Sequence, residues 1–223
     1  MEVYKLTRPD QTTHNACKWA TGRWKETDGS GELCGPGWLH SYSSPLLAVL
    51  HNPIHADYRP FILWRAEAGG EYRNDRGLKQ GHTRLRLLAQ VEPVVFTDVQ
   101  RAAYAIYCAL ATYPLWGKYD TKGAYKAWAD AYLFGTDRAA DAAYAATDAA
   151  RAAYAAADAA RAAYAAADAA RAAYAAADAA YAARAAYAAA DAAYAARAAY
   201  AAARADVAAV DFHALAEKAL LVQ

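Results

Sequence analysis

The residues best suited to chemistry lie in the stretch ELCGPGWLHSYSSPLLAVL, residues 32–50. It places Gly35, Gly37 and His40 before a segment that begins like a helix at Ser44. Glycine lets a backbone approach a ligand closely, and histidine titrates near neutral pH. Gly35, Gly37 and His40 are therefore the candidate cofactor-binding residues. The alternative is a structural turn with a buried, hydrogen-bonded histidine, because a lone glycine pair is a weak signal.

This stretch, together with the opening VYKLTR, resembles the N-terminal domain of an uncharacterised family of phage and bacterial proteins. Members share a Cys…Gly-x-His…Pro-Leu pattern, often followed by a long low-complexity repeat. The resemblance covers roughly the first hundred residues and implies a short α+β domain without a settled activity. Because of it, we expect a protein of phage origin.

A weaker resemblance is to ADP-ribosyltransferases, whose Gly-x-Gly-apolar-Tyr turn holds the nicotinamide end of NAD. It implies that Gly35, Gly37 and Leu39 or His40 form that turn. It also implies Glu67 or Glu92 as the catalytic glutamate. Tyr4–Lys5 stands where that family has His-Gly or Arg-Gly, so this signature is missing.

Metal binding is the next chemistry to weigh, but the ligand spacing does not favour it. There is no Cys-x-x-Cys pair, and zinc sites usually show such close pairs. His51 and His55 are four residues apart, but Pro53 between them argues against a continuous helix. We therefore predict neither a metal nor a cofactor. The side chains considered as ligands are His14, Cys17, Cys34, His40, His51 and His55.

Charge and cysteine content limit the partners. The formal net charge is +1, so no strong field points to nucleic acid. The basic run at residues 73–86 predicts a solvated hairpin, and binding of nucleic acid or a nucleotide beside tryptophans is the alternative. Three cysteines and no signal-peptide pattern after Met1 predict a cytoplasmic protein with reduced thiols and no membrane segment.

Composition divides the chain sharply at Gly135–Thr136, because all 12 glycines and all seven prolines lie at or before Gly135. We predict an α+β N-terminal head followed by a long all-α alanine-rich decapeptide-repeat region. The predicted parts are the head at 1–96, a helical connector at 97–135, the alanine-rich helical repeat at 136–206 and a C-terminal capping helix at 207–223.

Local signals predict several elements. Alternation over residues 2–7 predicts a strand, and residues 17–27 predict a strand pair around Gly22. Further strands are expected in residues 59–68 and 83–96. Helices are expected to begin at Ser44, at Thr97 or Asp98, and at Asp211, with a further helix ending at Gly135.

From Asp148 to Asp178 the residues other than alanine recur in steps of three, three and four, and after Asp178 the steps lengthen to three, three, three and four. Alanine has the highest helix propensity, so the repeat is predicted to be helical. Ten residues in three turns is about 3.3 per turn, against about 3.6 in an α-helix. Either the marked residues spiral around a long α-helix, which we prefer, or the chain is wound more tightly and they form a straight stripe.

A helix of alanine exposes much small apolar surface, which predicts homo-oligomerisation through the repeat or a spacer role. A low-complexity expansion without a task is the alternative. We therefore expect a non-enzymatic binding or assembly protein, with a host protein or nucleotide as a further partner of the head. The competing predictions are an NAD-binding transferase and a phage inhibitor of a host defence component. The expected repeat face consists of Tyr154, Tyr164, Tyr174, Tyr187, Arg151, Arg161, Arg171, Asp158, Asp168 and Asp178.

Overall fold

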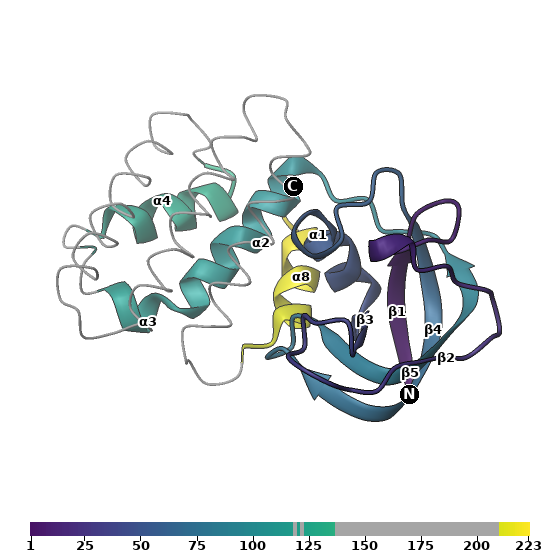
Figure 1. Ribbon diagram of the computed structural model, residues 1–223. Helices are drawn as coiled ribbons and strands as arrows, with labels where there is room; N and C mark the ends of the chain where they lie inside the picture. Colours follow the sequence, from purple (N-terminus) through teal and green to yellow (C-terminus); the bar gives the residue numbers. More distant parts are fainter. Residues whose placement is uncertain (118–119, 121–122, 137–209) are drawn as a thin grey trace. The chain divides into compact units, whose positions relative to one another are not determined.

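The computed structural model describes residues 1–117, 120, 123–136 and 210–223. The chain divides into two compact units, Met1–Val95 and Phe96–Gln223. In the described part the α+β prediction is confirmed, since an antiparallel sheet is accompanied by helices (Figure 1). The predicted repeat face, from Arg151 to Tyr187, lies outside the described residues, so its structure and its role in assembly stay predictions.

The first unit is built on a five-stranded sheet in which the order β1-β4-β5-β2 is extended by β3, which also pairs with β5. Every pairing is antiparallel. β4 and β5 form one long hairpin, and β2 and β3 both lie along the free edge of β5. The strands are β1 (Glu2–Thr7), β2 (Lys25–Glu26), β3 (Leu39–Ser41), β4 (Ile62–Asn74) and β5 (Gln80–Val91).

Two backbone hydrogen bonds close this sheet into a ring. Tyr4 N donates to Tyr42 O at 2.8 Å, and Tyr42 N donates to Tyr4 O at 2.8 Å. Tyr42 directly follows β3, so β1 pairs with β4, β4 with β5, β5 with β3, and the end of β3 with β1. The closed ring leaves few unpaired strand edges, which are otherwise sites of aggregation.

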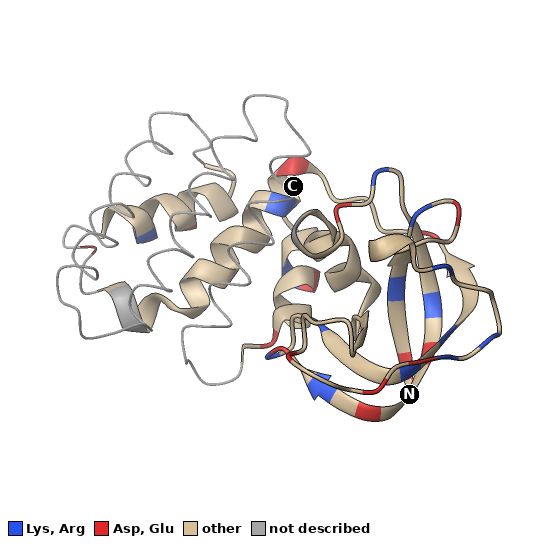
Figure 2. Ribbon diagram, viewed as in Figure 1, with Lys and Arg blue, Asp and Glu red and all other residues tan. Residues whose placement is uncertain are grey.

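Alternation along the strands separates an apolar interior from a charged exterior. Trp64, Ala66 and Ala68 of β4 face inward, while Arg65 and Glu67 between them face outward. Outward side chains form three ion pairs across neighbouring strands, Arg65–Glu2, Arg84–Glu26 and the half-buried Arg86–Glu67. Figure 2 shows that Lys, Arg, Asp and Glu residues occur along these strands. The core cluster comprises Val3, Trp19, Leu39, Trp64, Ala66, Ala68, Leu85 and Leu87.

The basic run lies on the β4–β5 hairpin, as the hairpin prediction requires. Its cations are dispersed: Arg73 stacks on Trp38 at 4.6 Å, and Arg84 and Arg86 stack on Trp24 at 4.7 and 4.6 Å. The strand pair predicted around Gly22 is wrong, because only Lys25–Glu26 is a strand. Gly22 has a φ of +77° and belongs to a turn, as local glycine chemistry allows.

The helix α1 (Pro45–His55) follows β3 after a short connection. Ser44 is its N-cap, as predicted, and its side chain accepts a hydrogen bond from Leu46 N at 3.2 Å. The expectation that Pro53 interrupts the helix is wrong. Pro53 lies in the last turn, and the helix continues through it to His55 although its missing N–H removes one helical hydrogen bond.

The second unit contains α2 (Asp98–Ala111), α3 (Tyr113–Trp116), α4 (Ala124–Leu133) and α8 (Phe212–Leu220). Thr97 begins α2 with a capping box that it shares with Gln100, and Asp211 caps α8. Gly135, with a φ of +74°, follows the end of α4. The aromatic residues Tyr125, Trp128 and Tyr132 of α4 are buried.

The C-terminal helix α8 packs against α2, a contact that the sequence did not predict. Gln100 Nε2 donates to Leu220 O at 2.9 Å, and the Lys218 ammonium lies 4.3 Å from the centre of the Tyr107 ring. These two helices are separated in the chain by the whole repeat. The second unit is therefore assembled from segments on both sides of the repeat.

The caps provide a matched stability test at two adjacent serines. Ser44→Ala removes the N-cap acceptor of α1, and we expect it to lower the free energy of unfolding by about 1 kcal/mol. Ser43 is exposed and precedes the cap, so Ser43→Ala should change it by less than about 0.5 kcal/mol. Urea unfolding of the full chain measures both. Equal effects of the two substitutions would contradict the assigned cap.

Candidate functional site

The glycine turn predicted to hold a cofactor is packed on the protein's own backbone. A Cβ at Gly37 would lie 2.2 Å from Ser30 O and 2.6 Å from Ser30 N. A Cβ at Gly35 would lie 2.9 Å from Glu32 O, which already accepts a hydrogen bond from Gly35 N at 2.7 Å. Both glycines thus permit close approach of the chain to itself, which favours the structural alternative.

The predicted glutamates do not lie beside this turn. Glu67 pairs with Arg86 in the register of β4 and β5, whereas His40 pairs with Gly81. Five residues along β5 correspond to about 17 Å at about 3.4 Å per residue. Glu67 is moreover bonded to Arg86, with 2.8 Å between Glu67 Oε2 and Arg86 Nε, and Glu92 is exposed beyond β5.

His40 instead belongs to a histidine cluster, defined here as His40, His51 and His55 with Tyr42 and Lys79. The rings of His51 and His55 lie 5.4 Å apart edge to face, and Tyr42 stacks on His55 at 5.9 Å. Tyr42 Oη and His55 Nδ1 share a hydrogen bond of 3.1 Å. The His40 ring is hydrogen-bonded to Leu33 O. Helix α1 supplies two of these imidazoles, and β3 and the residue after it supply His40 and Tyr42.

The cluster is electrically neutral apart from Lys79. Burial, with a smaller contribution from the Lys79 ammonium, lowers the pKa of His40 and of His51 to about 4. Burial, together with His51, Lys79 and His40, lowers the pKa of His55 to about 2. Burial also raises the pKa of Tyr42. At neutral pH these rings therefore act as hydrogen-bonding and packing groups rather than as cations.

Neutral imidazole is the form that binds metals, and this cluster contains three of the six side chains considered as ligands in the sequence analysis. Among the described residues, no group of three His, Cys, Asp or Glu side chains is placed to hold a metal ion. His14 is exposed, and Cys17 and Cys34 each contact a lysine. The cluster's geometry fits packing between α1 and the sheet.

A second polar group lies in the interior of the ring and was not predicted from the sequence. Lys5 is 8% exposed, donates to His40 O at 2.6 Å and lies 4.9 Å from the centre of the Trp19 ring. Burial lowers its pKa to about 8. Nearby in the register, Ser41 Oγ, Gln80 Oε1 and His82 Nε2 are buried without a hydrogen-bond partner in the described part of the chain. Lys5 alternates with apolar residues in β1, so only its place in the ring shows that it is buried.

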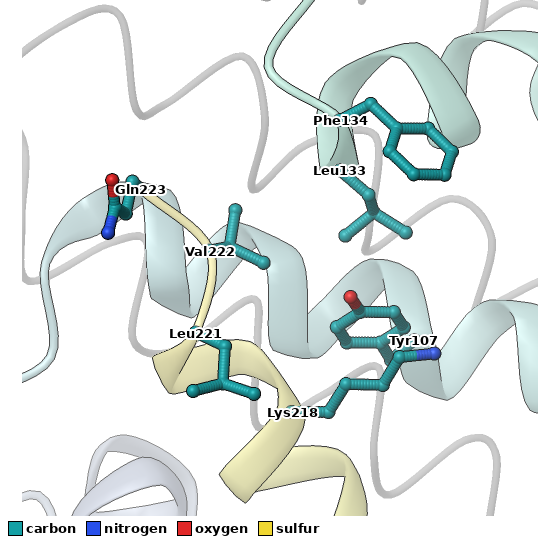
Figure 3. Close-up of a pocket in the computed structure, with 7 residues that line it drawn as sticks. All are labelled: Tyr107, Leu133, Phe134, Lys218, Leu221, Val222 and Gln223. Atoms are coloured by element: carbon teal, nitrogen blue, oxygen red, sulfur yellow. The ribbon is translucent and has the colours of Figure 1, made fainter.

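The second unit carries an open pocket of about 440 Å³, called here the terminal pocket (Figure 3). Its lining is largely apolar, and two of its side chains are unusually exposed, Phe134 at 82% and Leu221 at 80%. Its polar side chains are those of Tyr107, Lys218 and Gln223. The lining residues are Tyr107, Leu133, Phe134, Lys218, Leu221, Val222 and Gln223.

Comparison of the chain with protein-family models, with curated proteins and with solved structures returned no match. The part of the chain that the structure describes contains no helix long and apolar enough to cross a membrane. Both resemblances drawn from the sequence stay predictions. The pattern of the phage family is also kept only in part, because two residues separate Gly37 from His40.

The packing of Gly37 gives a test of its role. Gly37→Ala places a methyl group against the Ser30 backbone, and we expect a loss of about 2 kcal/mol or more in the free energy of unfolding. Gly69→Ala is the matched control, because a Cβ there meets no atom within 4 Å. Urea unfolding compares them. If the Gly37→Ala chain is as stable as the Gly69→Ala chain, Gly37 does not pack on the Ser30 backbone and is again a candidate cofactor-binding residue.

The histidine cluster predicts acid sensitivity of a defined sign. Unfolded histidines bind protons near pH 6.5, whereas the buried ones stay neutral until about pH 4 or below. The unfolded chain therefore holds more protons between these values, so stability should fall as the pH drops from 6.5 to 4.5. The midpoint of urea unfolding, measured across this range, reports the fall.

In the variant His55→Gln the unfolding midpoint should fall less between pH 6.5 and pH 4.5, because one buried imidazole that resists protonation has been removed. His14→Gln removes an exposed histidine of the same unit, and its unfolding midpoint should vary with pH in the same way as that of the unmodified chain. If the two variants have the same pH dependence, the cluster does not cause the acid sensitivity.

Proposed function

We propose that this chain is a non-enzymatic binding and assembly protein, and that its second unit joins to a second copy of itself through the terminal pocket. The observation that carries the proposal is the exposure of Phe134 and Leu221 at one pocket. Large apolar side chains gathered at one place on a surface are typical of protein–protein interfaces. The half-buried Leu133 and the buried Val222 also line this pocket (Figure 3).

The shape of the pocket supports a macromolecular occupant. Side chains exposed by four-fifths project from the surface, so a molecule small enough to enter the pocket would leave most of their area in water. A second protein surface can cover them. Burial of apolar area contributes about 25 cal/mol per Å², which makes such coverage favourable.

The sequence of the repeat supports a second copy as that occupant. In the sequence the repeat follows Thr136 and precedes Val210, so it is attached close to Phe134 and to α8. It carries seven Asp and seven Arg between residues 137 and 205, so identical copies do not repel by net charge. Its alanines permit close approach between copies. Phage origin and binding of a host component by the first unit remain part of this proposal on the strength of the family resemblance.

The test compares the full chain with a Phe134→Ser/Leu221→Ser double variant by size-exclusion chromatography with light scattering. We expect the unmodified chain to form a defined oligomer and the double variant to shift toward the monomer at the same concentration. Both side chains are exposed, so the fold should persist, and circular dichroism checks this.

Val95→Ser is the matched control, because Val95 is 83% exposed but lies in the first unit. It should leave the oligomeric state unchanged. A monomeric unmodified chain would overturn the proposed assembly, and an oligomer unaffected by the double variant would exclude the terminal pocket as its interface.

A further inference from the structure

Two cysteines of the first unit each contact a lysine amine. Lys79 Nζ lies 2.9 Å from Cys34 Sγ, and Lys25 Nζ lies 3.0 Å from Cys17 Sγ. These distances fall within the range of N–H···O hydrogen bonds, although sulfur is larger than oxygen. The third cysteine, Cys108, is buried and interacts with Tyr104 instead. Close thiol–amine contact is thus a property of the two cysteines nearer the surface.

The Cys34–Lys79 contact is fixed by the backbone on both sides and joins an exposed residue to a buried one. Cys34 is exposed, whereas Lys79 is 8% exposed. The backbone of Cys34 lies within the turn closed by Gly35 N and Glu32 O, and Lys79 O accepts from Asp75 N at 2.9 Å in the hairpin turn. The two residues are 45 positions apart, so the fold itself brings sulfur and nitrogen together.

We propose that Cys34 and Lys79 are a site of oxidative modification, at which a single oxygen atom becomes bonded to both Cys34 Sγ and Lys79 Nζ. Cys17 and Lys25, whose sulfur and nitrogen lie 3.0 Å apart, form a second site of this kind. The required oxidant is a peroxide, which reaches Cys34 from solvent. The product links the turn around Gly35 covalently to the residue before β5.

The reaction balances with two molecules of hydrogen peroxide. The lysine ammonium first gives a proton to solvent and becomes an amine. One S–H and one N–H bond break, one S–O and one O–N bond form, and sulfur and nitrogen are each oxidised by two electrons. The two peroxides yield the bridging oxygen and three waters. The first peroxide converts the thiol to a sulfenic acid, the ordinary first step of cysteine oxidation.

Geometry favours the oxygen bridge over the two competing products. A direct S–N bond would require the atoms to close from 2.9 Å to covalent bonding distance, whereas an intervening oxygen leaves them near their present separation. Further oxidation to sulfinic acid needs a second oxidant at sulfur before the neighbouring amine reacts. The amine is already in contact, so bridging has the advantage of proximity.

The test treats the full chain with hydrogen peroxide and measures its intact mass. Each oxygen bridge adds about 14 Da, a direct S–N bond removes about 2 Da, and a sulfinic acid adds about 32 Da. We expect gains of about 14 Da that a thiol reductant reverses. Trypsin should fail to cleave after Lys79 in the oxidised chain and should release a peptide that joins Cys34 to Lys79.

The Cys17→Ser background isolates the Cys34–Lys79 pair, and within it Lys79→Arg keeps the cation but removes the primary amine. We expect the Cys17→Ser chain to form the oxygen bridge and the Cys17→Ser/Lys79→Arg chain to form none. The same oxidised mass in both chains, or sulfinic acid alone, would overturn the proposal. Cys34→Ser in the Cys17→Ser background must also abolish the gain, and its persistence would place the modification elsewhere.

Discussion

The two backbone hydrogen bonds between Tyr4 and Tyr42 are the constraint on which the first unit depends. They turn an open sheet into a ring, and the ring creates an interior that holds the apolar core and Lys5. They also fix Tyr42 at the end of β3, and Ser44, the N-cap of α1, lies only two residues later. The histidine cluster follows from this placement, because it joins the end of β3 to the last turns of α1. A strand of only three residues thus positions most of the chemistry of the unit.

The buried polar groups of the first unit compensate for one another across distant segments. Lys5 carries a charge into the ring, where its hydrogen bond to His40 O and the face of Trp19 offset part of the cost of desolvation. The imidazoles around Lys79 remain uncharged, so the cluster contains one cation rather than four. Gly35 and Gly37 let the loop before β3 fold onto itself tightly enough to bring Cys34 to Lys79.

Features set by neighbouring residues were predictable from the sequence, and features set by distant contacts were not. Ser44, Thr97 and Asp211 begin helices because a side-chain oxygen meets a backbone N–H two or three residues away. The hairpin and β1 follow from local alternation. The ring closure, the contact of Lys5 with His40 and the Cys34–Lys79 contact join residues far apart in the chain, and no spacing encodes them. Pro53 misled the interpretation because its effect depends on how near it lies to the helix end. His40 was placed correctly before a helix, but its partners came from elsewhere in the fold.

The packing of α8 on α2 changes what the repeat is in genetic terms. The decapeptides are an insertion within the second unit rather than a tail, because the chain must return to place Leu220 beside Gln100. In-frame gain or loss of whole repeats leaves both helices encoded, so copy number can drift between lineages without deleting either partner. A premature stop codon anywhere in the repeat removes α8 and uncovers α2. Selection on this gene should therefore tolerate slippage in the repeat more readily than truncation within it.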